Sequence, residues 1–198
     1  PSIGAGCRVQ SFVCVCYIFG CSLFTLSCID CNASLFERDE LATVSRESWD
    51  GHMETNLWAP VLLSQAMAAG LPPGAEGNIV NIVDQRAANV SPGFLSYSVS
   101  KSALWALTQN LALSLAPAIR VNAIGPGPTL PSPRQTEEQF ARQAARVPLG
   151  HGATPEEIAN GVRYILASPS MTGQMIALDG GQHLGWDHPG PGGSPVEE

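Results

Sequence analysis

The chain has 198 residues, a net charge of −7 and a pI near 5.0. Apolar residues make up 44% of it and charged residues 14%, which fits a single compact α/β domain with a sizeable core. An acidic chain without a basic cluster is poorly suited to nucleic acid or to an anionic membrane surface, so we expect neither as a partner.

Residues 1–31 form an atypical, cysteine-rich apolar segment. All six cysteines of the chain lie in it. The spacings Cys14-x-Cys16 and Cys28-x-x-Cys31 lack the turn residues of a zinc knuckle, so we expect no metal site. As a membrane span or a secretory signal the segment is marginal. An alternative interpretation is that unrelated sequence has been joined to the domain here.

From residue 32 onward, short apolar runs alternate with helical patterns. Ser45 is a favourable N-cap, and Thr154 with Glu157 forms a capping box. The pattern predicts helices over 45–70, 97–115, 136–146 and 155–167, and strands over 78–83, 119–124 and 174–181.

This alternation predicts an α/β fold with a doubly wound parallel sheet of the Rossmann-like kind and right-handed crossovers. We assign residues 32–186 to this domain. Residues 187–198 contain too little apolar surface to fold, and we expect a disordered tail there.

Tyr97 and Lys101 are one helical turn apart in the predicted helix, so they lie on one face. A lysine ammonium beside a phenol lowers the tyrosine pKa. Asp84 ends the preceding apolar run, and its carboxylate can share a proton with that phenol. The three residues predict a proton-donating site for reducing a C=N or C=O bond. The alternative is an ordinary amphipathic helix with a solvated lysine, and an aspartate that only caps its loop.

Several motifs in order resemble the short-chain dehydrogenase/reductase family: CNAS, ETNLWAP, NIVNIV, YSVSK, IRVNAIGPG and LDGGQHLGW. They span roughly four-fifths of the chain. Most members have a serine thirteen residues before the tyrosine, and Asp84 stands at that place here. An aspartate there resembles the pteridine reductase branch, which reduces dihydropterins or dihydrofolates with NADPH.

The resemblance implies NADPH as cofactor and a pterin-like small molecule as substrate. Tyr97 would deliver the proton, and Asp84 would assist it or orient the pterin. Lys101 would lower the pKa of Tyr97 and bind the hydroxyls of the nicotinamide ribose. Asn56 would hold a water that links Lys101 to solvent; the alternative for Asn56 is a polar residue paired with its own helix backbone.

The resemblance also assigns the walls of the cofactor site. Asn32 and Ala33 would line the adenosine side, and Pro126 and Gly127 would pack beside the nicotinamide, where a glycine admits close backbone approach. Family members are cytoplasmic dimers or tetramers, so we expect a cytoplasmic homo-oligomer.

One part of the family pattern is absent. Two strand–helix units should precede Asn32, each needing roughly 30 residues, and the 31 residues there lack the glycine-rich turn that binds the dinucleotide. We therefore expect an N-terminally incomplete fold and hypothesise that this chain binds NADPH weakly and turns over little. Three interpretations stay open: a pteridine-type reductase, a non-catalytic truncated remnant, and a membrane-anchored binding module.

Overall fold

The computed structural model describes residues 28–90 and 93–185. Four parallel strands form one sheet in the order β1 (Cys28–Cys31), β2 (Gly77–Ile82), β3 (Ile119–Pro126) and β4 (Met175–Leu178). The helices are α1 (Arg46–Met53), α2 (Ala59–Gly70), α3 (Leu95–Leu115), α4 (Glu137–Ala145) and α5 (Pro155–Leu166). A π-helical turn, η1 (Glu54–Trp58), joins α1 to α2, and short 3₁₀ turns follow two of the strands as η2 (Gln85–Ala87) and η3 (Gln182–Leu184).

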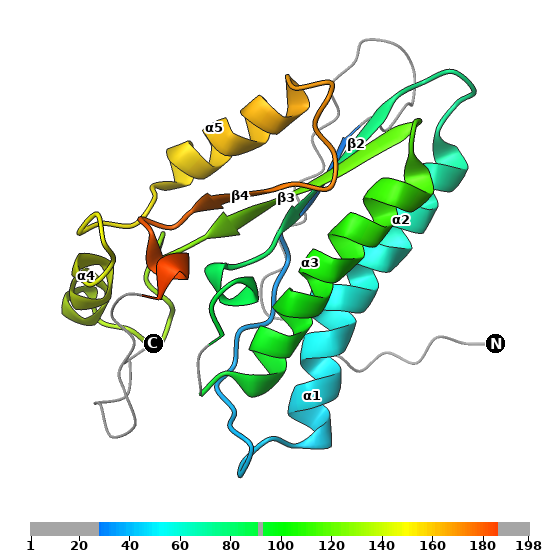
Figure 1. Ribbon diagram of the computed structural model, residues 1–198. Coiled ribbons are helices and arrows are strands. Elements are labelled where there is room, and N and C mark those ends of the chain that lie inside the picture. The colour runs from blue at the N-terminus through cyan, green and yellow to red at the C-terminus, as the bar shows by residue number, and fades with distance from the viewer. Residues whose placement is uncertain (1–27, 91–92, 186–198) are drawn as a thin grey trace.

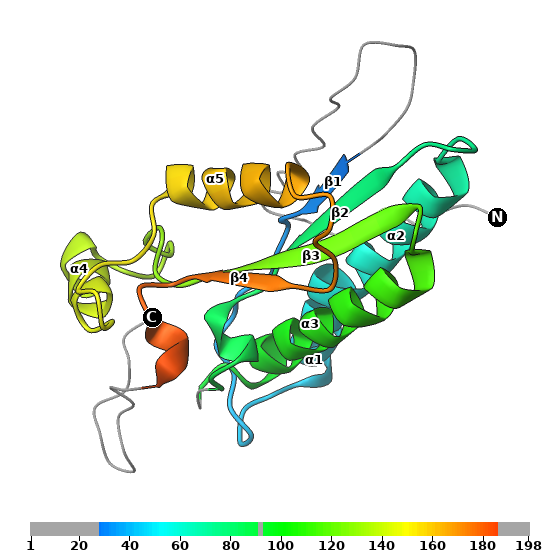
Figure 2. The same ribbon diagram turned by 45° about the horizontal axis from the view of Figure 1, so that its top comes forward.

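Helices cover both faces of the sheet, as Figure 1 and Figure 2 show. On one face, α2 and α3 pack over a cluster that includes Ile79 and Val121. On the other face, α5 packs through Ile165 on Val80 and Ile124. Because successive strand residues point to opposite faces, neighbours in β2 belong to different clusters. Burial on both faces explains why these strands are continuous apolar runs, and the predicted Rossmann-like fold is confirmed.

One crossover differs in hand from the other two. The sheet grows in one direction from β1 to β4, but the first two connections place their helices on one face and the third places α5 on the opposite face. When two successive connections step in the same direction across a sheet, moving the connecting helix to the opposite face reverses the handedness of that crossover. The prediction of right-handed crossovers throughout is therefore wrong for at least one connection. By changing face, α5 covers apolar residues of β2 and β3 that α2 and α3 leave uncovered.

Side-chain caps begin three of the helices, and those at Ser45 and Thr154 were predicted from the sequence. Ser45 accepts a hydrogen bond from the Ser48 amide at the start of α1. Thr136 and Thr154 each form a complete capping box, at α4 and α5 respectively. The predicted helix over 45–70 is present, but the π-helical turn η1 divides it.

The predicted domain boundary after residue 31 falls at the end of β1. Cys28 to Cys31 pair in register with Asn78 to Asn81 of β2, so these residues belong to the sheet. The boundary must therefore be moved to before Cys28. Residues 1–27 and the predicted tail lie outside the described residues.

None of the helices in the described ranges has the length and apolar character needed to cross a bilayer. Within the same ranges, no three His, Cys, Asp or Glu side chains are grouped as metal ligands would be.

Candidate active site

Five of the predicted site residues lie at or just beyond the carboxyl ends of three parallel strands, the edge where open α/β sheets bind ligands: Asn32 and Ala33 at β1, Asp84 at β2, Pro126 and Gly127 at β3. Asn56 lies in η1, and Tyr97 and Lys101 lie in the first two turns of α3. The fold therefore brings the predicted site residues to one edge of the sheet.

Tyr97 and Asp84 are joined by a direct side-chain hydrogen bond. The Tyr97 hydroxyl donates to Asp84 Oδ2 over 2.7 Å. The other carboxylate oxygen, Oδ1, accepts the backbone N–H of Arg86 over 2.8 Å and begins η2. The two interpretations of Asp84, as partner of the tyrosine and as cap of the next turn, both hold because each uses a different oxygen.

The pKa of Tyr97 is raised well above its ordinary value, first by burial and then by the Asp84 carboxylate. Arg86 opposes the rise. The net shift of the Tyr97 pKa is therefore opposite to the lowering expected from Lys101, because the residue is only 6% exposed and has a negative neighbour. At neutral pH the tyrosine is protonated.

Lys101 is the only lysine of the chain, and its side chain is buried. Its ammonium donates to the Ile82 carbonyl over 2.8 Å and lies 5.8 Å from the centre of the Tyr97 ring. Burial lowers the pKa of Lys101 to about 8, while Asp84 and Cys31 act to raise it. The alternative of a solvated lysine is wrong.

Asn56 bonds to other elements and not to its own helix. Its amide nitrogen donates to the Leu35 carbonyl and to Ser100 Oγ, each over 2.9 Å. Its amide oxygen accepts the Leu35 N–H over 2.7 Å. Asn56 thus ties the loop after β1 to α3 beside the Tyr97–Lys101 pair, and a π-helical turn, common at functional sites, places it there. Its water-holding role remains a prediction.

Gly127 is required by packing within the sheet. A Cβ atom at this position would lie 2.7 Å from the Cα of Asp179 beyond β4. The backbone of Gly127 therefore lies close to Asp179, and a larger residue would clash there. This contact is sufficient to explain why position 127 is a glycine. Asn32 is exposed at the same edge, and Ala33 and Pro126 are half-buried.

A buried polar cluster at the start of α3 was not predicted from the sequence. Asp39 accepts hydrogen bonds from the Ser96 amide over 3.0 Å, from the Ser96 hydroxyl, and from Ser48 Oγ over 2.6 Å. His52 Nδ1 lies 2.8 Å from Ser96 Oγ. Nothing in the charged string around Asp39 distinguishes it from a surface loop, and only its partners reveal it.

An aromatic and cationic group next to Tyr97 is the second feature that sequence reasoning missed. Phe36 stacks on Phe94 with centroids 4.6 Å apart, and its ring meets that of Tyr97 nearly edge-on at 4.6 Å. Arg134 donates to the Phe36 carbonyl over 2.5 Å and to Glu37 Oε2 over 2.6 Å. The loops after β1 and β3 are thereby joined beside the tyrosine.

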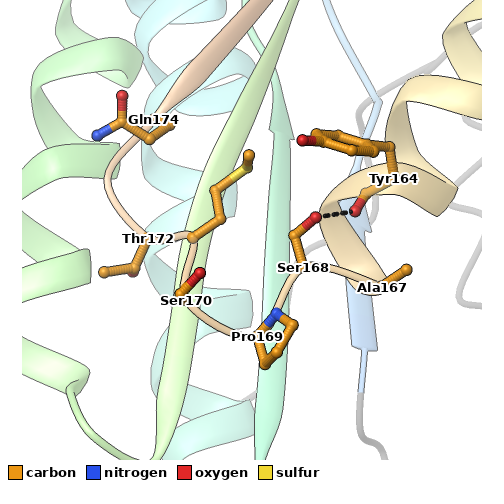
Figure 3. Close-up of a pocket in the computed structure, with 8 residues that line it drawn as sticks. Tyr164, Ala167, Ser168, Pro169, Ser170, Thr172 and Gln174 are labelled. Carbon is orange, nitrogen blue, oxygen red and sulfur yellow. Dashed lines mark hydrogen bonds between the residues drawn. The ribbon is translucent and has the colours of Figure 1, made fainter.

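A separate hollow of about 600 Å³ lies at the opposite edge of the sheet, between the end of α5 and the start of β4. Figure 3 shows Tyr164, Ser168, Ser170, Thr172 and Gln174 around it. Its lining holds no carboxylate, histidine, lysine or cysteine. The hollow therefore lacks the acid–base pair found at the Tyr97 edge.

Residues 24–183 match the family model described as Enoyl-(Acyl carrier protein) reductase. The chain is 37% identical over 146 residues to Protein FixR of Bradyrhizobium diazoefficiens, which covers 72% of this chain and 52% of that protein. It is 32% identical over 148 residues to Dehydrogenase/reductase SDR family member 4 of Homo sapiens, covering 70% and 52% respectively. The chain belongs to the short-chain dehydrogenase/reductase family.

Among solved structures, this short-chain dehydrogenase/reductase is similar to FolM alternative dihydrofolate reductase 1 from Brucella suis in complex with NADP. The TM-score is 0.81 at 48% identity, over 83% of this chain and 67% of that chain. The predicted family is confirmed, and this neighbour agrees with the predicted resemblance to the dihydrofolate-reducing branch. The chain spans about half the length of the curated relatives named above, 52% of each.

Proposed function

We propose that this chain carries the catalytic part of an NADPH-dependent reductase that acts on a dihydropterin or a related pteridine. The observation that carries the proposal is the 2.7 Å hydrogen bond from Tyr97 to Asp84, the residue that replaces the usual serine. Similarity at 48% identity to a FolM alternative dihydrofolate reductase in complex with NADP supports it.

In the proposed reaction, a hydride and a proton add across a C=N bond of the pteridine ring. NADPH, when bound, supplies the hydride. Tyr97 supplies the proton: its O–H bond breaks as an N–H bond forms on the ring nitrogen, and water returns a proton to the phenolate. Asp84 orients the tyrosine hydroxyl or the ring nitrogen. Because the pKa of Tyr97 is raised, the donor is already protonated when substrate arrives.

The residues at this edge fit the nicotinamide end of NADPH. Lys101 donates one N–H to the Ile82 carbonyl, and a lysine ammonium has two further N–H donors that could bind the ribose hydroxyls. Asn56 would support Lys101 through a water. The cofactor walls would be formed by Asn32, Ala33, Pro126 and Gly127.

Isothermal titration with NADPH tests whether the chain works as a reductase or as a non-catalytic remnant. Micromolar binding supports the reductase. The absence of measurable heat up to millimolar NADPH would instead support the remnant, and the weak-binding hypothesis with it.

Substrate class is tested by assaying NADPH oxidation with dihydrobiopterin against a panel of simple ketones. The proposal expects a higher kcat/KM for the pterin. A preference for the ketones would overturn the pteridine assignment while leaving the reductase assignment in place.

A further inference from the structure

Arg86 is buried at the centre of the site, although its sequence position gives it no role. The residue is only 6% exposed. The guanidinium carbon lies 5.6 Å from the ring centre of Phe36, 5.3 Å from that of Phe94 and 5.9 Å from that of Tyr97. These distances are within the range of cation–π attraction. A second guanidinium, that of Arg134, lies 5.5 Å from the centre of the Phe36 ring.

Arg86 also holds one side of the Asp84 carboxylate. Oδ1 of Asp84 accepts the Arg86 backbone N–H over 2.8 Å, and the guanidinium lies 3.5 Å from the same oxygen. Oδ2 is left to accept the Tyr97 hydroxyl. If the carboxylate rotated, both sets of contacts would be lost, so the contacts on Oδ1 determine where Oδ2 points.

Lys101, unlike Arg86, does not hydrogen-bond to the Asp84 carboxylate. Its ammonium donates to the Ile82 carbonyl of β2, and Asp84 is reached by the guanidinium of Arg86. The titratable and charged groups around Tyr97 are thus Asp84 and Arg86 from the turn after β2, Lys101 from α3, and His52 of α1, whose ring centre is 6.3 Å from that of the tyrosine.

We propose that Arg86 is the positioning residue of the Tyr97–Asp84 pair: its guanidinium, packed against three aromatic rings, keeps Asp84 oriented as the acceptor for the Tyr97 hydroxyl. The charge of Arg86 also opposes the rise in the pKa of Tyr97 caused by burial and by Asp84, and so keeps the phenol a usable acid. The inference extends the proposed function, but its structural part holds without it.

A ligand-free test uses Lys101 as a reporter, because the only lysine of the chain gives a single ¹³Cε-lysine NMR signal. We expect the wild-type signal to titrate near pH 8. Arg86→Met frees the Asp84 carboxylate to turn toward the ammonium of Lys101, so the midpoint should rise by about half a unit or more. Arg86→Gln should raise it likewise.

Two controls separate charge coupling from damage to the fold. Arg46→Met removes an exposed arginine–carboxylate pair on α1 and should leave the midpoint unchanged. In an Asp84→Asn background the effect of Arg86→Met should shrink, because the coupling runs through the carboxylate. Unchanged midpoints in folded Arg86→Met and Arg86→Gln, or an equal shift in the Asp84→Asn background, would overturn the proposal.

A second readout rests on the proposed function. With NADPH and dihydrobiopterin, Arg86→Met should lower kcat by about tenfold or more, and Arg86→Lys should recover part of the loss. The KM for NADPH should stay within about twofold, because Arg86 acts on the proton donor. Equal kcat in wild type and Arg86→Met would contradict the proposal. If no form of the chain oxidises NADPH, the proposed function fails and the lysine titration alone decides the role of Arg86.

Discussion

The carboxylate at position 84 changes the acid–base state of the neighbouring tyrosine. A serine hydroxyl donates or accepts a hydrogen bond, whereas an ionised carboxylate only accepts. Its charge adds to burial in raising the pKa of Tyr97. A carboxyl group can also help to protonate a basic ring nitrogen, which a serine hydroxyl cannot, and this is the residue-level reason to favour a pteridine over a ketone.

Asp84→Ser should lower kcat/KM for dihydrobiopterin reduction by about 10²–10⁴-fold, because the acceptor that orients Tyr97 is lost. Steady-state assays with NADPH measure the change. Asp50→Ser, on the exposed side of α1, is the matched control and should behave as wild type. A full rate with Asp84→Ser would contradict a role for the carboxylate.

Lys101 should make the folded chain more stable as pH rises above neutrality. Its pKa is about 8 in the folded state, below the ordinary 10.5, so the unfolded chain binds more protons between these values. The free energy of unfolding should therefore increase by roughly 2 kcal/mol from pH 7.5 to 9.5 relative to Lys101→Met. Urea denaturation of both chains at the two pH values measures it, and parallel pH dependences would contradict the lowered pKa.

At the scale of elements, α3 is capped from outside the helix. Asp39, in the loop before α1, accepts the Ser96 amide, and its own carbonyl accepts the Leu95 amide. A carboxylate at a helix N-terminus also interacts favourably with the helix dipole. Because Tyr97 follows these residues directly, the same contacts locate the proton donor.

Asp39→Ala should lower the free energy of unfolding by about 1–3 kcal/mol, since three donors lose their acceptor. Burial alone would raise the pKa of Asp39, but the hydrogen bonds from Ser48 and Ser96 hold it below 3.8. The stabilisation is thus present above about pH 4 and lost as pH falls through the folded pKa. Urea denaturation at pH 7 and pH 3 should show the difference between Asp39→Ala and wild type shrinking in acid.

Exposed apolar side chains on η1, α2 and α3 indicate how whole molecules could associate. Trp58 and Leu62 are each about half exposed, and Leu113 is 84% exposed. In both views α2 and α3 lie side by side on the outer side of the sheet (Figure 1, Figure 2). We propose that a second copy of the chain covers this surface, which is the homo-oligomer expected from the resemblance.

Light scattering after size exclusion should give at least twice the mass of one chain. The double variant Leu62→Asp/Leu113→Asp should give one chain mass, because it places charge on the proposed contact. Leu41→Asp, in the exposed loop before α1, is the control and should leave the mass unchanged. A single-chain mass for wild type would rule out the oligomer.

Local sequence by itself determined the helix starts, the central strands and the family. Capping depends on residues three apart, as at Thr136 and Thr154, so it can be read from short stretches. A strand buried on both faces is a continuous apolar run, as in β2 and β3. The ordered motifs then predicted a site at Tyr97, Lys101 and Asp84, and the fold places the three residues together.

Only the tertiary structure decided how those residues work. The direction of the Tyr97 pKa shift depends on burial and on which cation reaches Asp84, and the contact comes from Arg86, whereas Lys101 bonds to Ile82. Asp39 acquires its role through Ser96, fifty-seven positions away. Charges and hydrogen bonds act through space, so residues that are ordinary in sequence become decisive once the fold sets them within a few ångströms of the proton donor.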